Sequence, residues 1–302
     1  GRRQAGPGTF ADAACRNASM KLFSYISMLA VLLVALPDGQ AQEPKAATDL
    51  KALVERQRVL LLRAERAVDE VAIEDLRAPL QRLVYDYERY LRAHPQEVAG
   101  YVSYAMLLGN PLLDERQRAV ALLVKANQLD AHLPLVKNQL GNFLAEQGQP
   151  LMALNYFLAA VQLEPKEPLY HYQVGTLLTE ARDDFLQSPE WTREAVDRSM
   201  HQAFEQAMML APDNLAYAYR YWESFYDLEQ PDWAKALAGW RALEERMESP
   251  VERQTIRLHQ ANVLIKQGRA DEARDLLATV TEEVLDGQKQ KLVAELPVPA
   301  EE

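Results

Sequence analysis

Residues 134–167 read PLVKNQLGNFLAEQGQPLMALNYFLAAVQLEPKE, and these 34 residues of the 302-residue chain decide the fold. Two apolar patterns with helical periodicity flank Gly148, which predicts two helices joined by a turn. Gly141 and Ala153 are small residues at the positions where two antiparallel helices would approach closely. A glycine inside a helix costs about 1 kcal/mol relative to alanine, so Gly141 needs such a packing reason. Pro165 cannot continue the second helix and predicts the next turn.

The spacing of this unit recurs along the chain. Ala153, Phe157 and Ala160 share one face of the predicted second helix, because residues three and four apart are neighbours on a helix. Their intervals of 4 and 3 residues, followed by 5 residues to the turn, return at Leu83, Tyr87, Tyr90 and Pro95, at Ala119, Leu123, Ala126 and Ala131, and at Met200, Phe204, Ala207 and Pro212. A last unit keeps intervals of 12, 4 and 3 residues at Ala261, Ala273, Leu277 and Val280.

This pattern resembles the tetratricopeptide repeat (TPR), whose units are 34-residue helix-turn-helix pairs. The resemblance covers residues 76–280 and implies an all-α fold, a TPR-type α-solenoid forming a right-handed superhelix of about six antiparallel helix pairs. The composition agrees, since 12 Gly and 16 Pro are few for a turn-rich all-β protein. The hydrophobic share of 48% also excludes a wholly disordered chain.

Two departures from the repeat predict irregular regions. Met200 follows Gly175 by 25 residues instead of 12, which places an insertion at about 182–194. Insertions of this kind project from one face of a solenoid, often a binding face. Trp222 stands where the other units have a small residue, so we expect this unit to pack differently, with a wider helix separation. Trp240 takes the position that Phe157 has in residues 134–167.

The domain organisation follows from these boundaries. A helical stretch over 49–74 is expected to pair with a helix over 80–93, which gives an N-terminal capping pair within 42–95. The repeat array then occupies 96–282. Residues 283–302 are expected to form a charged C-terminal tail, either as a final helix or frayed.

The N-terminal region predicts a secretory signal peptide. Met20 and a lysine precede a 15-residue apolar stretch, 22–36, and the small residues Gly39 and Ala41 follow. A charged start, a short apolar core and a small-x-small exit are typical of such a peptide, and a spanning helix needs about 20 residues. We predict a signal peptide over 20–41 with cleavage after Ala41, hence an exported protein, periplasmic or secreted, of a bacterial type. The alternative is an uncleaved membrane anchor.

Residues 1–19 are interpreted as translation upstream of a start at Met20, or as a fragment edge, and not as a native segment. They contain Cys15, the single cysteine of the chain. Without it the mature protein is expected to have no disulfide and no thiol nucleophile. The chain carries 33 basic and 44 acidic residues, a net charge of −11. This charge argues against nucleic acid as a partner, because binding to phosphate backbones needs clustered Lys and Arg.

No motif of catalysis or metal binding is present. The histidines form no HExxH pattern and no pair spaced by four residues, so we predict no metal ion, no cofactor and no catalytic residue. Asp183 and Asp184 lack the spaced oxygen ligands of a calcium loop and are read as solvated carboxylates. The five histidines are His94, His132, His171, His201 and His259.

The surface expected to carry function is the concave side of the stack, lined by the first helix of each pair. Its residues are polar and aromatic with few charges, which suits an extended peptide or protein segment. Alternatively, several of the tyrosines pack between neighbouring pairs. Capture of a terminal carboxylate is not predicted, because Leu169 and Gln173 stand where basic partners would be needed. The groove is predicted to contain Ser103, Met106, Asn138, Gln139, Asn142, Glu146, Tyr172, Gln173, Thr176, Tyr219, Arg220, Glu223, Tyr226, His259 and Asn262.

These observations favour a non-catalytic protein-protein interaction scaffold or adaptor of the bacterial cell envelope, with an envelope protein or peptide as its partner. One alternative is an enzyme, or an accessory domain, acting on an envelope polymer through Glu180, Asp183, Asp184 and Glu223. Another is a membrane-tethered assembly factor that retains residues 22–36. No stable membrane insertion is expected if the signal is cleaved.

Overall fold

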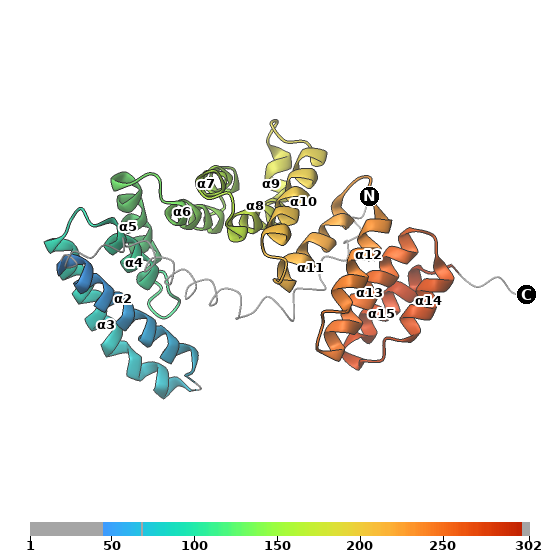
Figure 1. Ribbon diagram of the computed structural model, residues 1–302, viewed down its shortest axis with the longest axis horizontal. Coiled ribbons are helices and arrows are strands. Elements are labelled where there is room, and N and C mark those ends of the chain that lie inside the picture. The colour runs from blue at the N-terminus through green and yellow to red at the C-terminus, as the bar shows by residue number, and fades with distance from the viewer. Residues whose placement is uncertain (1–44, 68, 298–302) are drawn as a thin grey trace, which may run out of the picture. The chain divides into compact units, whose positions relative to one another are not determined.

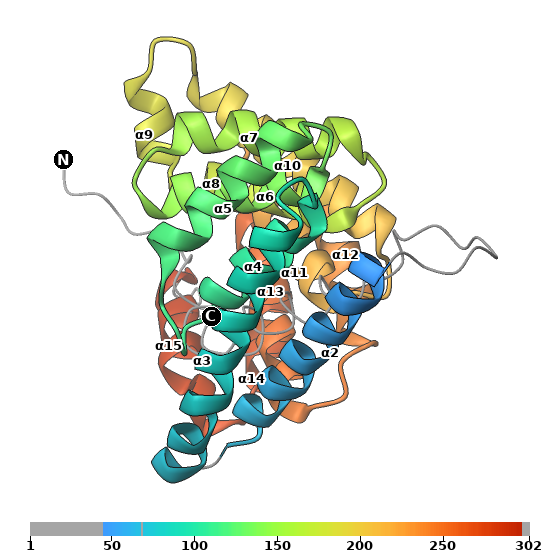
Figure 2. The ribbon, with the colours of Figure 1, turned by 90° about the vertical axis from the view of Figure 1, so that its left-hand side faces the viewer.

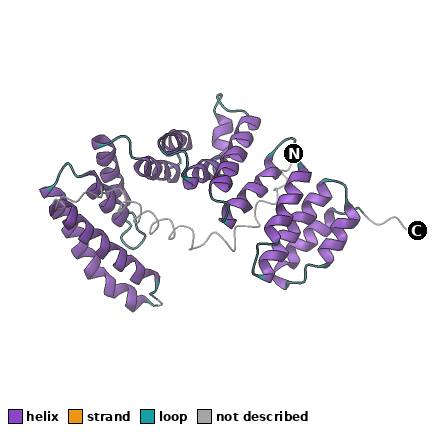
Figure 3. Cartoon of the chain, in the orientation of Figure 1, coloured by secondary structure: helices purple, strands orange, loops and turns teal. Residues whose placement is uncertain are grey.

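A computed structural model describes residues 45–67 and 69–297 (Figure 1). All regular secondary structure in these residues is helical (Figure 3). The predicted signal peptide over 20–41 and the upstream segment 1–19 lie outside the described residues. Within the described residues, no helix has both the length and the apolar character that crossing a bilayer requires.

The described residues divide into two compact units, one that ends at Phe143 (unit 1) and one that begins at Leu144 (unit 2). In unit 1, α2 packs against α3 and α4 against α5, and α2 and α3 lie side by side (Figures 1 and 2). Helix α6 spans the boundary. The helices are α2 (Lys45–Glu65), α3 (Glu70–Ala93), α4 (Val98–Leu108), α5 (Arg116–Leu129) and α6 (Pro134–Glu146).

The first helix is shorter than predicted. The expected helical stretch 49–74 was wrong at its end, because α2 stops at Glu65 and α3 begins at Glu70. Asp69 explains the break: its carboxylate accepts a hydrogen bond from the backbone N–H of Ala72 at 2.8 Å. This N-cap satisfies a donor that the start of a helix leaves open. The pairing of the two helices is nevertheless as expected.

The core of unit 1 uses the repeat positions. Leu83 and Tyr87 are fully buried on α3. The Tyr87 hydroxyl donates to the side-chain carbonyl of Gln57, which is itself buried, at 2.7 Å. The Tyr87 ring stacks on Tyr104 with centroids 5.4 Å apart, so α2, α3 and α4 meet around this side chain. A Cβ on Gly100 would lie 2.8 Å from the ring of Tyr90, which requires glycine at that contact.

Unit 2 continues the paired arrangement, with α8 packed between α7 and α10, and α13 packed between α12 and α14. Two short 3₁₀ helices, η1 (Ser224–Asp227) and η2 (Glu283–Leu285), interrupt the series. The helices are α7 (Pro150–Leu163), α8 (Pro168–Glu180), α9 (Arg182–Gln187), α10 (Arg193–Leu210), α11 (Leu215–Glu223), α12 (Trp233–Glu244), α13 (Pro250–Lys266), α14 (Ala270–Ala278) and α15 (Asp286–Glu295).

Gly175 stands where two helices approach each other closely. A Cβ at this position would lie 2.7 Å from the ring of Phe204, closer than real side chains pack. Phe204 itself is 1% exposed, between the buried Met200 and Ala207 of α10. The large ring therefore fills the space that the glycine leaves, which joins α8 to α10.

The unit with Trp222 packs differently, as expected. A Cβ on Gly239 would lie 2.3 Å from the Trp222 indole. The glycine of this helix pair thus stands on the second helix, α12, and the large ring on the first, α11. Trp240, next to Gly239, is fully buried like Phe157.

The insertion 182–194 is anchored to the fold and includes a short helix, α9. Phe185 is fully buried and meets the ring of Trp191 edge-on, with centroids 5.2 Å apart. Arg182 places its guanidinium 2.8 Å from Asp197 and 2.7 Å from Asp227. The buried Phe185 ring with its Trp191 contact and the ion pairs of Arg182 therefore hold the segment against the fold.

The described part of the C-terminal segment 283–302 is packed. Helix α15 contacts α13 and α14. Leu285 and Leu292 are buried together with Leu277 and Ala261. The final-helix interpretation therefore fits residues 283–297, and residues 298–302 lie outside the described residues.

Candidate protein-binding surface

The structure buries part of the predicted groove. Ten of the fifteen residues are half-buried or exposed. The other five are buried and offer almost no surface to a partner. Helical spacing identifies which residues face inward on each helix, but not how deeply the neighbouring helices bury them. The buried residues are Ser103, Met106, Asn138, His259 and Asn262. The half-buried or exposed residues are Gln139, Asn142, Glu146, Tyr172, Gln173, Thr176, Tyr219, Arg220, Glu223 and Tyr226.

His259 is the centre of an aromatic cluster. Its Nε2 lies 2.7 Å from the Tyr219 hydroxyl, and its ring stacks on Trp240 with centroids 4.3 Å apart. The Tyr226 hydroxyl donates to the His259 carbonyl at 3.2 Å. Burial lowers the pKa of His259 to about 3, so its imidazole is neutral at physiological pH. These two tyrosines therefore serve largely to join α11 and η1 to α13.

Four half-buried residues form a more open surface, which we call the α8–α11 surface: Tyr172 and Gln173 on α8, and Arg220 and Glu223 on α11. The Tyr172 ring lies 5.7 Å from that of Phe204, and the Arg220 guanidinium lies over the same Phe204 ring at 5.0 Å. A shared ring therefore brings the two helices together.

The electrostatics of this surface are balanced. Arg220 and Glu223 form an ion pair, with side chains 24% and 12% exposed. Burial raises the pKa of Tyr172, and the nearby Arg220 partly opposes this shift. The phenol is neutral at physiological pH as a result. The surface offers aromatic area, amide groups and one ion pair to a ligand.

Tyr217 belongs beside this surface and was not predicted. Its ring lies 4.8 Å from that of Tyr172. Burial raises its pKa to about 12. Tyr217 precedes Arg220 by three residues, a spacing that places both on one side of a helix. That spacing was a usable signal, although helical spacing counted from Trp222 favoured Tyr219.

One pair of side chains has the composition of a catalytic dyad but not its geometry. His201 Nδ1 lies 2.8 Å from Ser224 Oγ. The Ser224 hydroxyl donates to the backbone carbonyl of Tyr221 at 2.6 Å, and Ser224 is 3% exposed. Its proton is directed away from the imidazole and a substrate cannot reach its oxygen, so this serine is not an activated nucleophile.

The carboxylates considered for an enzyme do not gather in a pocket. Glu180, Asp183 and Asp184 lie exposed at the surface, while Glu223 pairs with Arg220. Among the described residues, no cluster of three or more His, Cys, Asp or Glu side chains is suited to hold a metal ion.

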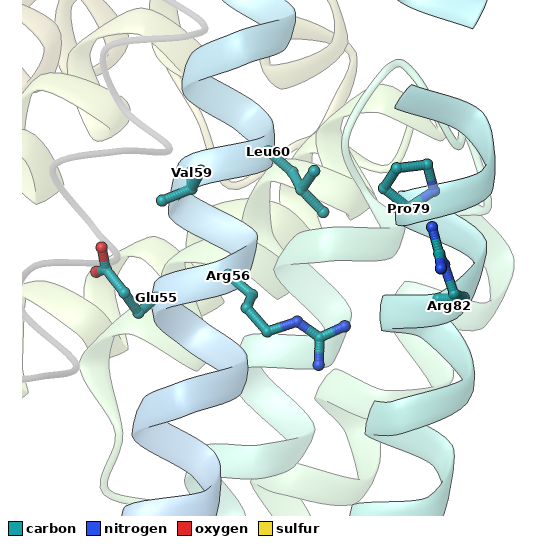
Figure 4. A pocket seen from close by; sticks show the side chains of 6 residues that line it. All are labelled: Glu55, Arg56, Val59, Leu60, Pro79 and Arg82. Atoms are coloured by element: carbon teal, nitrogen blue, oxygen red, sulfur yellow. The ribbon is translucent and has the colours of Figure 1, made fainter. Parts of the chain in front are cut away.

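A shallow pocket of about 330 Å³ lies between α2 and α3 in unit 1 (Figure 4). Its apolar lining comes from Val59, Leu60 and Pro79, and charged side chains surround it. Arg56 reaches across to Asp86 at 2.8 Å, which joins the two helices. The charged residues of the lining are Glu55, Arg56 and Arg82.

Comparison with known proteins places this architecture. No family model matches the chain. No curated protein matches it either. Among solved structures, YrrB, described as a TPR protein with an unusual peptide-binding site, matches with a TM-score of 0.55 at 15% identity, over 68% of this chain and 97% of YrrB. The fold is a TPR-type α-solenoid. The predicted fold class is thereby confirmed.

Two further solved structures also match the fold of this chain. PilF of Pseudomonas aeruginosa has a TM-score of 0.55 at 15% identity, over 82% of this chain and 99% of PilF. A chain of the Naa15/Naa10 complex bound to HypK-THB has a TM-score of 0.51 at 14% identity, over 83% of this chain and 33% of that one. At these identities the likeness concerns the fold.

Proposed function

We propose that this TPR solenoid is a non-catalytic interaction scaffold that binds a peptide or protein segment at the α8–α11 surface. The observation that carries the proposal is the cluster in which Tyr172 and Arg220 approach one buried ring, Phe204, from two different helices. Rigid aromatic side chains and arginine contribute most to protein interfaces.

The chemistry of the surface suits a segment with one apolar anchor. The edge of the Tyr172 ring offers apolar contact at a small loss of side-chain entropy. Gln173 has both a donor and an acceptor, which can pair with a peptide backbone. The description of YrrB as carrying an unusual peptide-binding site supports peptide binding as one use of this fold.

The test compares two matched double variants of the full chain. Peptides are first selected from a displayed random library on the wild type, and their affinities are measured by fluorescence anisotropy. We expect Gln173→Ala with Arg220→Gln to weaken binding about 10-fold or more. Gln202→Ala with Arg198→Gln changes the same residue types on α10, where Arg198 also forms an ion pair, with Glu194. Equal affinity of both variants would refute the proposed site.

We further propose that the protein acts in the bacterial cell envelope after removal of residues 20–41. The apolar stretch 22–36 and the small residues before Gln42 support export. N-terminal sequencing of protein recovered from the envelope fraction is expected to begin at Gln42. A chain that still begins at Met20 would instead support the membrane-tethered alternative, and fractionation would then place it with the membranes.

A further inference from the structure

Helix α7 has an outward face without charge. Its 14 residues, PLMALNYFLAAVQL, include no Asp, Glu, Lys or Arg. Ala153, Phe157 and Ala160 turn one side of the helix into the core. The opposite side, which we call the α7 face, exposes Leu151, Met152, Leu158 and Leu163 at 41%, 53%, 48% and 37%. The uncharged amides Asn155 and Gln162 lie between them and are also exposed.

The fold does not require such a face. Helix α10 is also the second helix of its pair, and the exposed Glu194 and Arg198 form an ion pair on its outer side. Helix α14 likewise exposes Asp271 and Glu272. Single exposed leucines are ordinary, whereas several large apolar side chains exposed on one uncharged helix face indicate an interaction site. Packing within the fold therefore does not explain the exposed apolar residues of the α7 face, whereas a binding partner would.

The stretch of chain that contains α7 is acidic. Residues 144–190 contain seven acidic and two basic residues. Arg182 is directed toward Asp197 and Asp227 and so contributes little positive charge to the surface. Helix α9, which packs against α7, exposes Asp183 and Asp184. An apolar strip with a negative border is the result.

We propose that the α7 face binds a basic amphipathic helix of a partner protein. The apolar row of such a helix would cover Leu151 and Leu158, while its flanking Lys and Arg side chains would meet the acidic border. With 14 residues, α7 offers a strip of about 21 Å, which matches a partner helix of about four turns. This surface shares no residue with the α8–α11 surface, so the inference goes beyond the proposed function.

Two other occupants fit less well. A second copy of this chain, related by two-fold symmetry, would place the acidic border against itself. An anionic membrane surface would be repelled by the same carboxylates. A basic amphipathic segment complements both the apolar side chains of the α7 face and the negative charge around them.

The experiment uses the full chain and a fluorescent synthetic helix with leucines on one face and lysines on the other. We expect the wild type to bind this helix, and Leu151→Ser with Leu158→Ser to weaken binding about 10-fold or more. Added salt should weaken binding, because the flanking contacts are ionic. Met209→Ser, which alters a residue 63% exposed on α10, is the matched control and should bind as the wild type does.

Several outcomes would overturn the proposal. One is equal affinity of the Leu151→Ser, Leu158→Ser variant and the wild type, with circular dichroism showing that both are folded. Another is equally tight binding of a helix in which glutamates replace the lysines. Dimerisation of the wild type, or its binding to anionic vesicles, would also overturn it if the double variant abolished either. The Gln173→Ala, Arg220→Gln variant should keep its affinity for the basic helix, so that failure of one site is distinguishable from failure of the other.

Discussion

Unit 1 and unit 2 build the same kind of helix pair from different chemistry. Residues 45–143 carry 14 basic and 13 acidic residues, whereas residues 144–302 carry 15 basic and 28 acidic residues. All four tryptophans, Trp191, Trp222, Trp233 and Trp240, belong to unit 2. The comparison teaches that repeat packing constrains a few small and large positions and leaves surface charge and much of the interior chemistry free.

The buried polar groups of the two units differ in the same way. In unit 1, Tyr87 and Gln57 form a neutral hydrogen bond between two helices. In unit 2, the polar centre is the titratable ring of His259, enclosed by Trp240 and two tyrosines. Intrinsic tryptophan fluorescence reports on unit 2 alone, while circular dichroism reports on both, so the two units can be followed separately during unfolding.

The largest expected effect is the loss of the tryptophan at the centre of unit 2. Trp240→Ala removes a fully buried side chain that contacts both His259 and Tyr219. We expect the free energy of unfolding of unit 2 to fall by about 3–5 kcal/mol. Urea denaturation followed by the fluorescence of the remaining tryptophans measures this change. A fall below about 1 kcal/mol would contradict the assigned role of Trp240.

The second prediction concerns the contact between Gly239 and Trp222. In Gly239→Ala, the new methyl group would overlap a rigid indole, so we expect a loss of about 3 kcal/mol, the upper end of ordinary overpacking. Gly287→Ala is the control, because no atom lies within 4 Å of its added Cβ, and it should keep or slightly raise stability. Thermal unfolding of both variants decides the matter, and an equal midpoint would refute the close contact.

The third prediction is a pH dependence confined to unit 2. Because burial lowers the pKa of His259 to about 3, the unfolded chain binds this proton at a higher pH than the folded chain does. Stability is therefore present above the ordinary histidine pKa and is lost as the pH falls toward 3. We expect a loss of about 2 kcal/mol between pH 7.5 and pH 5.

The measurement for this prediction is urea unfolding, followed by tryptophan fluorescence, at a series of pH values. His259→Asn should flatten the pH dependence relative to the wild type. Burial also lowers the pKa of His201, so part of the slope should remain. His132→Gln, at a side chain 86% exposed, serves as the control and should retain the full slope. If the His259 variant also retained it, the burial argument would fail.

The smallest expected effect lies in unit 1. Tyr87→Phe removes one hydrogen bond and leaves the buried carbonyl oxygen of Gln57 without its partner, which we expect to cost about 1–2 kcal/mol. Adding Gln57→Leu should recover most of this loss, since both polar groups are then gone. Circular dichroism during urea unfolding measures the cycle, and additive losses in the double variant would contradict the pairing.

The repeat spacing predicted the core well, because buried positions on stacked helices follow the helical period. Met200, Phe204 and Ala207 are all interior, as are Ala273 and Leu277. The spacing could not fix where α2 ends, since the apolar pattern runs on past the point where Asp69 caps the next helix.

The candidate site was less predictable for a related reason. Spacing assigned His259 and Asn262 to the inner face, but their exposure depends on what the neighbouring helix places above them. Trp240 stacks on His259 and covers it, and no local pattern around residue 259 announces that contact. Tyr172 and Arg220 remain half-buried because their shared partner, Phe204, lies beneath them.

In the α11–α12 pair the large residue stands on the first helix and the small residue on the second, and this reversal affects how the fold is recognised from sequence. A repeat profile scores each column of the sequence separately and expects the small residue on the first helix. Here the knob is Trp222 and the hole is Gly239, so two columns are altered while the contact between them is preserved. A comparison of structures detects the preserved contact, whereas a sequence profile detects only the residue expected in each column. A solenoid can therefore keep its geometry after its repeat motif is no longer recognisable in the sequence.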